Sequence, residues 1–171
     1  VQRHLDRLVV PCVTANFAAI HVLAQNLASD AAFEQLLAQI RYEIGYAIDR
    51  VLTGEPDAMV MGMSAETFWD GVEGNRTFVR RVGELSGGRK VATGAEACER
   101  ALKLFGVRRI GVVTPYQPIG DKNVVRFFGD LGFEVAAIKG LRCPTAVAIA
   151  HVDADTLRAA RIEVNPDVDA R

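Results

Sequence analysis

Two short apolar runs, each followed by a turn of glycine, proline or hydroxyl residues, constrain the fold of this sequence most. Residues 58–61 (Ala-Met-Val-Met) precede the turn 62–64, and residues 109–114 (Arg-Ile-Gly-Val-Val-Thr) precede the turn 115–116. An apolar run without alternation predicts a central strand of a parallel sheet that is covered on both faces. We therefore expect two comparable strand-to-helix corners, one in each half of the chain.

Helical patterns alternate with these strands, which indicates an α/β fold with two doubly wound parallel-sheet lobes. Apolar spacing and capping residues predict helices over 30–52 (capped by Ser29), 65–85, 94–105, 121–131 and 154–160 (capped by Asp153). Further strands are expected over 8–13, 20–24, 90–93 and 133–138, while residues 144–151 are ambiguous. The Gly87-Gly88 break predicts an N-terminal lobe over 1–86 and a second lobe over 87–171.

Charge and hydropathy exclude several classes of partner. The 171 residues include 20 basic and 21 acidic side chains, so the net charge of −1 gives no reason to expect nucleic acid or an anionic membrane as a partner. No apolar run reaches the roughly 18 residues of a membrane span, and the first residues lack the apolar core of a signal peptide. We expect a cytoplasmic protein.

The cysteines and histidines predict neither a metal site nor a disulfide framework. Cys12, Cys98 and Cys143 lie far apart in an odd number, and the three histidines have no metal-ligand spacing. The helical pattern places Cys98 on an apolar face, so we expect it to pack in the core. Cys12 follows a predicted strand end and is the weak candidate for a catalytic thiol, with a structural role as the simpler interpretation.

The first corner has the composition of an anion site. Gly62 allows a sharp turn with close approach of the backbone, and Ser64 is suited to cap the next helix. The first amide donors of such a helix point outward, at the carboxyl end of the strand where α/β proteins bind ligands. We expect this corner and the one at Tyr116 to hold a small carboxylic acid.

Three segments give the chain a resemblance to a known superfamily. They are residues 60–71 (Val-Met-Gly-Met-Ser, then Phe-Trp-Asp-Gly at 68–71), residues 106–116 and residues 127–135. In this order and spacing they resemble the aspartate/glutamate racemase superfamily, and within it the branch of arylmalonate decarboxylase and maleate cis-trans isomerase. The similarity runs from about residue 29 to residue 152.

The resemblance implies two pseudo-symmetric lobes with an active site between them and no metal, pyridoxal phosphate or nucleotide cofactor. In the family, backbone amides and hydroxyls bind the substrate carboxylate, and cysteines at strand ends act as acid, base or nucleophile. Carried over to this sequence, the carboxylate-binding positions are Gly62, Met63, Ser64, Tyr116 and Thr93. The resemblance also implies a homodimer.

The sequence departs from the family pattern at the catalytic positions. Met63 stands where the decarboxylase has a second hydroxyl and the isomerase a cysteine, and a thioether cannot donate a hydrogen bond. The other family cysteine belongs to a strand expected after residue 170, and Cys143 does not match it. The connection after Thr14 is also shorter than the family's helix. We therefore expect a truncated or incompletely represented polypeptide, and the catalytic residues stay unknown.

Three hypotheses about function remain. The first is a lyase or isomerase without a cofactor, which acts on a small carboxylic acid through an enediolate-type intermediate. The second is a relative that binds a small carboxylate without catalysis, because Met63 and the absent cysteine remove the acid–base pair. The third is an α/β interaction module without either property.

Overall fold

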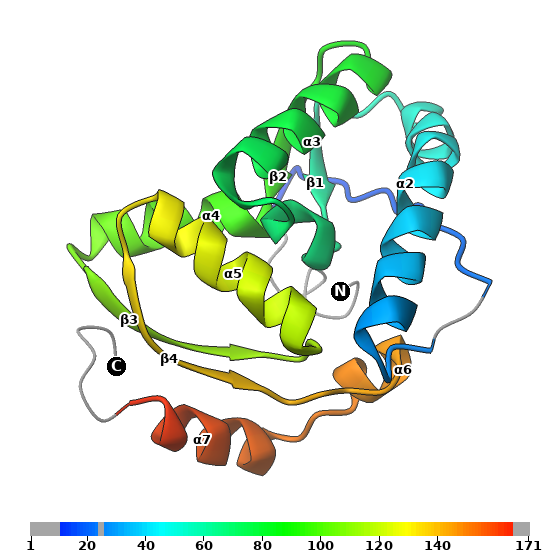
Figure 1. Ribbon diagram of the computed structural model, residues 1–171. Helices are drawn as coiled ribbons and strands as arrows, with labels where there is room; N and C mark the ends of the chain where they lie inside the picture. The colour runs from blue at the N-terminus through cyan, green and yellow to red at the C-terminus, as the bar shows by residue number, and fades with distance from the viewer. Residues whose placement is uncertain (1–10, 24–25, 166–171) are drawn as a thin grey trace.

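The computed structural model describes residues 11–23 and 26–165, and it shows helices alternating with parallel strands (Figure 1). In chain order the elements are α2 (Asp30–Leu52), β1 (Ala58–Met61), the short 3-10 helix η1 (Ala65–Phe68), α3 (Gly71–Leu85), β2 (Lys90–Thr93), α4 (Gly94–Leu104), β3 (Arg109–Thr114), α5 (Pro118–Asp130), β4 (Glu134–Gly140), α6 (Ala146–Ala150) and α7 (Ala154–Glu163). The predicted α/β alternation is confirmed from α2 onward.

Within the described residues, the strands form two parallel pairs, β1 with β2 and β3 with β4. The register places Met61 beside Thr93 in the first pair and Thr114 beside Gly140 in the second. A boundary after Ser86 would separate β1 from its hydrogen-bonded partner. The predicted division into lobes at residues 86 and 87 stays a prediction.

The pair β3–β4 is covered on both faces. Helix α5 lies on one face, against β4, and α7 lies on the other, against β3 (Figure 1). Gly111 permits the close approach of α7, because a Cβ atom at this position would lie 2.2 Å from the carbonyl oxygen of Val164. This half of the molecule is therefore doubly wound, as the sequence predicts.

Residues 58–61 form the predicted strand, but the pair β1–β2 is covered on one face only in the described part of the chain. The expectation that this strand is covered on both faces was therefore wrong. Met59 is buried against α2 and α3, in a cluster with Ile44, Ile48, Phe78 and Val82. Val60 points the other way and is 71% exposed. The sequence misled because an apolar residue indicates that burial is favourable, not that a covering element is present.

A core cluster packs α2 and η1 against α5 and the pair β3–β4. Helix α2 contributes Phe33 and Leu37, η1 contributes Phe68, and α5 contributes Phe127 and Phe128. The ring of Phe68 meets that of Phe127 edge-on, with ring centroids 5.1 Å apart. Because α3 and η1 both pack against α5, the helices that follow β1 and β3 touch directly, and this contact brings the two corners together.

Several boundaries and faces differ from the sequence prediction. The predicted helix over 65–85 is interrupted, because Asp70 and Gly71 adopt left-handed backbone conformations between η1 and α3. Helix α5 begins at Pro118, three residues early, since proline suits the first helical position. Residues 144–151 contain the short helix α6, while Ser29 and Asp153 cap their helices as predicted.

Two further predictions were wrong. Residues 11–13 and 20–23 form no strand, and the rest of the predicted strands 8–13 and 20–24 lies outside the described residues. Cys98 is exposed, as is Phe105, which is 79% accessible. Helix α4 packs through Ala95 and the half-buried Leu102. Cys98 lies at helical spacing from both, so its exposure means that the described residues cover only part of this stripe.

Candidate functional site

The two corners bring their hydroxyl groups into direct contact. Ser64, which follows β1, shares a hydrogen bond of 2.5 Å between its Oγ and the phenolic oxygen of Tyr116, which follows β3. The residues are 52 positions apart in the sequence and stand at the carboxyl ends of strands from different sheets. Ser64 is exposed and Tyr116 is buried, so the pair joins the protein interior to the surface. The expectation that these two hydroxyls lie together is confirmed.

Ser64 does not cap the following helix, contrary to the sequence prediction. Its backbone is already helical, with φ −92° and ψ −37°, and its side chain makes no capping bond. Instead, the sulfur of Met63 accepts the amide N–H of Glu66 at 3.3 Å. The serine carbonyl accepts both the amide N–H and the hydroxyl of Thr67, at 3.0 and 2.7 Å. These bonds fix the backbone of Ser64 while its hydroxyl turns to Tyr116.

Tyr116 is held by close packing around its ring. The ring is 7% exposed and lies 5.5 Å, centroid to centroid, from Phe33 of α2. On the other side Gly120 allows close contact, since a Cβ there would lie 2.6 Å from the tyrosine Cβ. Burial raises the pKa of Tyr116, although the hydrogen bond with Ser64 opposes that change. The phenol is therefore protonated at neutral pH and can donate a hydrogen bond.

The remaining carboxylate-binding candidates lie near the first corner but differ in their bonding. Thr93 ends β2 beside Met61 and is buried, and its hydroxyl accepts the amide N–H of Glu96 and donates to the carboxylate of the same residue. Its main role in the structure is thus to cap α4. Gly62 is exposed and Met63 is half-buried. Contact between a substrate and these residues stays a prediction.

The structure does not assign the catalytic thiol. Cys12 lies in an exposed turn with φ 71°, and within the described residues no hydrogen bond links it to Ser64 or Tyr116. Cys143 is buried. Cys98 is close enough to Tyr116 for its negative charge to raise the pKa of the phenol, and partial desolvation raises the pKa of Cys98 itself.

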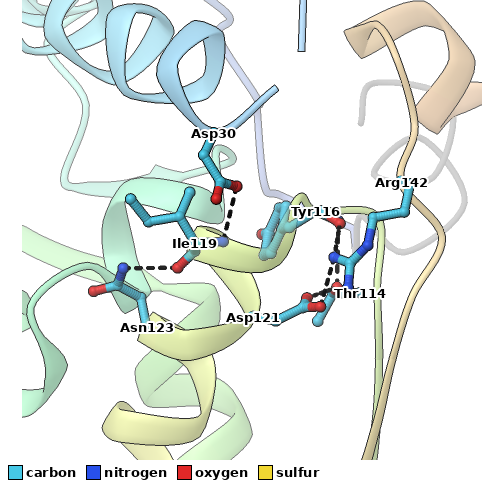
Figure 2. A network of polar contacts seen from close by, with 7 residues as sticks. All are labelled: Asp30, Thr114, Tyr116, Ile119, Asp121, Asn123 and Arg142. Carbon is cyan, nitrogen blue, oxygen red and sulfur yellow. Dashed lines mark hydrogen bonds and ion pairs between the residues drawn. The ribbon is translucent and has the colours of Figure 1, made fainter. Parts of the chain in front are cut away.

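Sequence reasoning missed two charged residues that surround the second corner. Asp121 is buried and Arg142 reaches it from the loop after β4, with 2.6 Å between Arg142 Nη1 and Asp121 Oδ2 (Figure 2). Asp121 lies three and seven residues before Val124 and Phe128, both of them buried, so an acidic residue on this apolar stripe was a usable signal. No local pattern points to Arg142.

Two other features of the described residues bear on the site. An open depression of about 570 Å³ lies at the amino ends of β1 and β2, lined by residues 55–57 and 87–90. It is at the opposite end of those strands from Ser64, whereas ligands of open α/β sheets bind at the carboxyl ends. No helix among residues 11–23 and 26–165 is both long and apolar enough to cross a membrane.

Comparison with protein families identifies the family of this chain. The arylmalonate decarboxylase family model matches residues 8–170, which is nearly the whole sequence. The chain therefore belongs to the arylmalonate decarboxylase family. Among curated protein sequences, none matches this chain.

Solved structures of similar fold include two isomerases and a decarboxylase. A variant of the maleate isomerase Iso from Pseudomonas putida, solved with maleate, is 20% identical with a TM-score of 0.75, and the match covers 98% of this chain and 66% of that one. The Nocardia farcinica maleate cis-trans isomerase bound to TRIS is 17% identical with a TM-score of 0.74, covering 87% and 62%. A crystal structure of arylmalonate decarboxylase is 20% identical with a TM-score of 0.65, covering 78% and 59%.

These likenesses establish the fold. The predicted racemase-like α/β architecture is confirmed by the agreement with isomerase and decarboxylase structures. The chain spans about 60% of the length of the solved relatives it matches.

Proposed function

We propose that this chain carries part of the active site of a lyase or isomerase that acts on a small carboxylic acid without a metal or organic cofactor. The observation that supports this most directly is the hydrogen bond between Ser64 and Tyr116, which joins the two strand-end corners. Membership of the arylmalonate decarboxylase family is a second, independent support. Solved relatives are named for maleate and arylmalonate, which suggests a mono- or dicarboxylate of similar size.

In this proposal the two hydroxyls bind one carboxylate of the substrate. The oxygens of a carboxylate are acceptors only, so a phenol and a serine hydroxyl can each donate to it by turning away from each other. Loss of CO2 from a malonate, or loss of an α-proton, leaves negative charge spread over the carboxylate as an enediolate. Fixed donors stabilise that charge, and removal of one such donor typically costs about a hundredfold in rate. A proton then returns to the α-carbon from a donor that the described residues do not identify.

The direct test is exchange at the α-carbon. Proton NMR of malonate, phenylmalonate or maleate incubated with the protein in deuterium oxide should show deuterium entry, loss of CO2 or isomerisation. Substituting Ser64→Ala or Tyr116→Phe should reduce the rate, and should weaken binding of the same acids about tenfold, because each change removes a hydrogen bond to a charged group. Unchanged values in both variants would remove these residues from the site.

A second candidate function is carboxylate binding without turnover. It is favoured by Met63, whose sulfur is engaged by the amide of Glu66 and supplies no proton donor to the first corner. Thermal stabilisation of the protein by malonate or maleate, with no exchange at the α-carbon, would identify a binding protein. The homodimer and the cytoplasmic location stay predictions from the sequence, and size-exclusion chromatography tests the first.

A further inference from the structure

A closed ring of hydrogen bonds begins and ends on the backbone of Tyr116 (Figure 2). The amide N–H of Tyr116 donates to Oγ1 of Thr114 at 3.2 Å, and that hydroxyl donates to Asp121 Oδ1 at 2.5 Å. The second carboxylate oxygen of Asp121 accepts from Arg142 Nη1 at 2.6 Å. The same nitrogen donates to the carbonyl oxygen of Tyr116, also at 2.6 Å. Both polar backbone groups of the tyrosine are therefore held by one network.

The network is buried on one side and contains the ion pair of Asp121 and Arg142. Thr114 and Asp121 are 4% and 6% exposed, and both oxygens of the carboxylate have a partner. Fully satisfied buried networks of this kind rigidify the groups they join, because each bond is stronger at low local dielectric and a lost partner is costly. The ring therefore fixes the backbone of Tyr116 more firmly than an ordinary turn would.

The loop after β4 is shaped to deliver the arginine. Arg142 adopts a left-handed backbone conformation with φ 54°, which is strained for a residue with a side chain. Its guanidinium lies over Gly140, where a Cβ atom would be 2.3 Å from Nη1 and 2.5 Å from the carboxylate of Asp121. The strained backbone of Arg142 and the absence of a side chain at Gly140 both allow the guanidinium to reach Asp121.

We propose that Asp121 and Arg142 are positioning residues that act through Tyr116, by fixing its backbone so that the phenol meets Ser64. With the backbone held and the ring packed between Phe33 and Gly120, the hydroxyl has one place to lie. Displacement of a catalytic group by about 1 Å can cost about a hundredfold in rate, so such support matters for function. The consequence for catalysis rests on the proposed function, whereas the consequence for the hydroxyl pair does not.

The first experiment compares Arg142→Gln with a matched control. Binding of maleate is measured by calorimetry, and we expect Arg142→Gln to weaken it about tenfold, because two charge-assisted bonds are lost. Lys139→Gln is the control, since Lys139 lies three residues earlier in β4, forms an ion pair of 2.6 Å with Glu163 and has 43% side-chain exposure against 44% for Arg142. It should leave binding unchanged. Arg142→Lys should restore part of the affinity, because an ammonium group can donate to both acceptors.

A double-mutant cycle separates positioning from general structural support. In a Tyr116→Phe background, Arg142→Gln should have no further effect on maleate binding, because the group that it positions has lost its hydroxyl. A merely structural arginine would weaken binding by the same factor in both backgrounds. Equal factors, or no effect of Arg142→Gln in the parent protein, would overturn the proposal.

A measurement without any acid keeps the inference separate from the proposed function. In a Tyr42→Phe, Tyr46→Phe background, Tyr116 is the one tyrosine of the three that remains, and its ionisation can be followed by ultraviolet absorbance. Ser64→Ala should shift that titration in the parent protein but not together with Arg142→Gln, since the hydroxyls would no longer meet. If Tyr116→Phe leaves maleate binding unchanged, the proposed function fails. This titration still decides the inference, and persistence of the Ser64 effect in Arg142→Gln would refute it.

Discussion

The two strand-end corners differ in how completely their buried carboxylates are hydrogen-bonded. Each is followed by a buried carboxylate on the next helix, Glu66 after β1 and Asp121 after β3. Both oxygens of Asp121 are bonded, to Thr114 and Arg142. Glu66 bonds Arg41 at 2.6 Å through one oxygen, and its other oxygen is buried with no hydrogen-bond partner in the part of the chain that the structure describes.

This difference in bonding matches a difference in exposure. Tyr116 is enclosed, whereas Ser64 is exposed and has no capping role. The side chain of Tyr116 at the second corner is therefore held firmly, whereas the side chain of Ser64 at the first corner has fewer constraints. A site that places one hydroxyl firmly and leaves its partner adjustable can exchange their mutual bond for two bonds to a carboxylate.

The largest expected effect tests the rigidity of the second corner by substituting a glycine beside Tyr116. In Gly120→Ala the new Cβ would lie 2.6 Å from the tyrosine Cβ, so we expect a loss of about 1–3 kcal/mol in unfolding free energy. Gly129→Ala is the matched control on the same helix, where nothing lies within 4 Å of the added atom. It should be neutral or stabilising by up to about 1 kcal/mol. Urea denaturation measures both, and equal stability of the two variants would show that the second corner is not tightly packed.

The sequence predicted the elements of both corners because their signals are local. Strand β1, strand β3 and the caps Ser29 and Asp153 follow from periodicity and from side-chain chemistry within a few residues. Ser64 and Tyr116 follow strands of different sheets, and their meeting was expected from the family resemblance, which implies a site between two lobes.

The exposure of single side chains and the hydrogen bonds that hold Tyr116 were not predictable in the same way. The exposure of Cys98 and Val60 depends on which elements cover a face, and hydropathy does not report that. The ring around Tyr116 needs Arg142, which lies 26 residues further along the chain and in a strained backbone conformation. A non-local contact of this kind leaves no periodic pattern in the sequence.

A smaller effect is expected from the unpaired carboxylate of the first corner. Burial raises the pKa of Glu66, although its bond with Arg41 opposes the change. A carboxyl with a folded-state pKa above its unfolded value holds its proton more tightly when folded, so its contribution to stability is present at low pH and is lost as pH rises through the folded pKa. Relative to the parent protein, Glu66→Gln should therefore gain unfolding free energy between about pH 4 and about pH 7, on the order of 1 kcal/mol.

The control for this pH dependence is an exposed carboxylate on the neighbouring helix. Glu73 pairs with Arg76 and its side chain is 76% exposed, so Glu73→Gln controls for the loss of a carboxylate that solvent already screens. Urea midpoints at several pH values measure both variants. A constant difference between Glu66→Gln and the parent protein would mean that burial does not raise the pKa of Glu66.

The smallest expected effect lies at the contact between the corners. Because the bond with Ser64 lowers the pKa of Tyr116 against the effect of burial, Ser64→Ala should raise that pKa, measured by ultraviolet titration with Tyr42 and Tyr46 replaced by phenylalanine. Thr53→Ala is the control, since it removes an exposed hydroxyl that donates to the carbonyl of Arg50 at the end of α2. An unshifted titration in Ser64→Ala would mean that the hydroxyls do not share a bond in solution. The hydroxyls of Ser64 and Tyr116 would then come together only when a carboxylate binds to both.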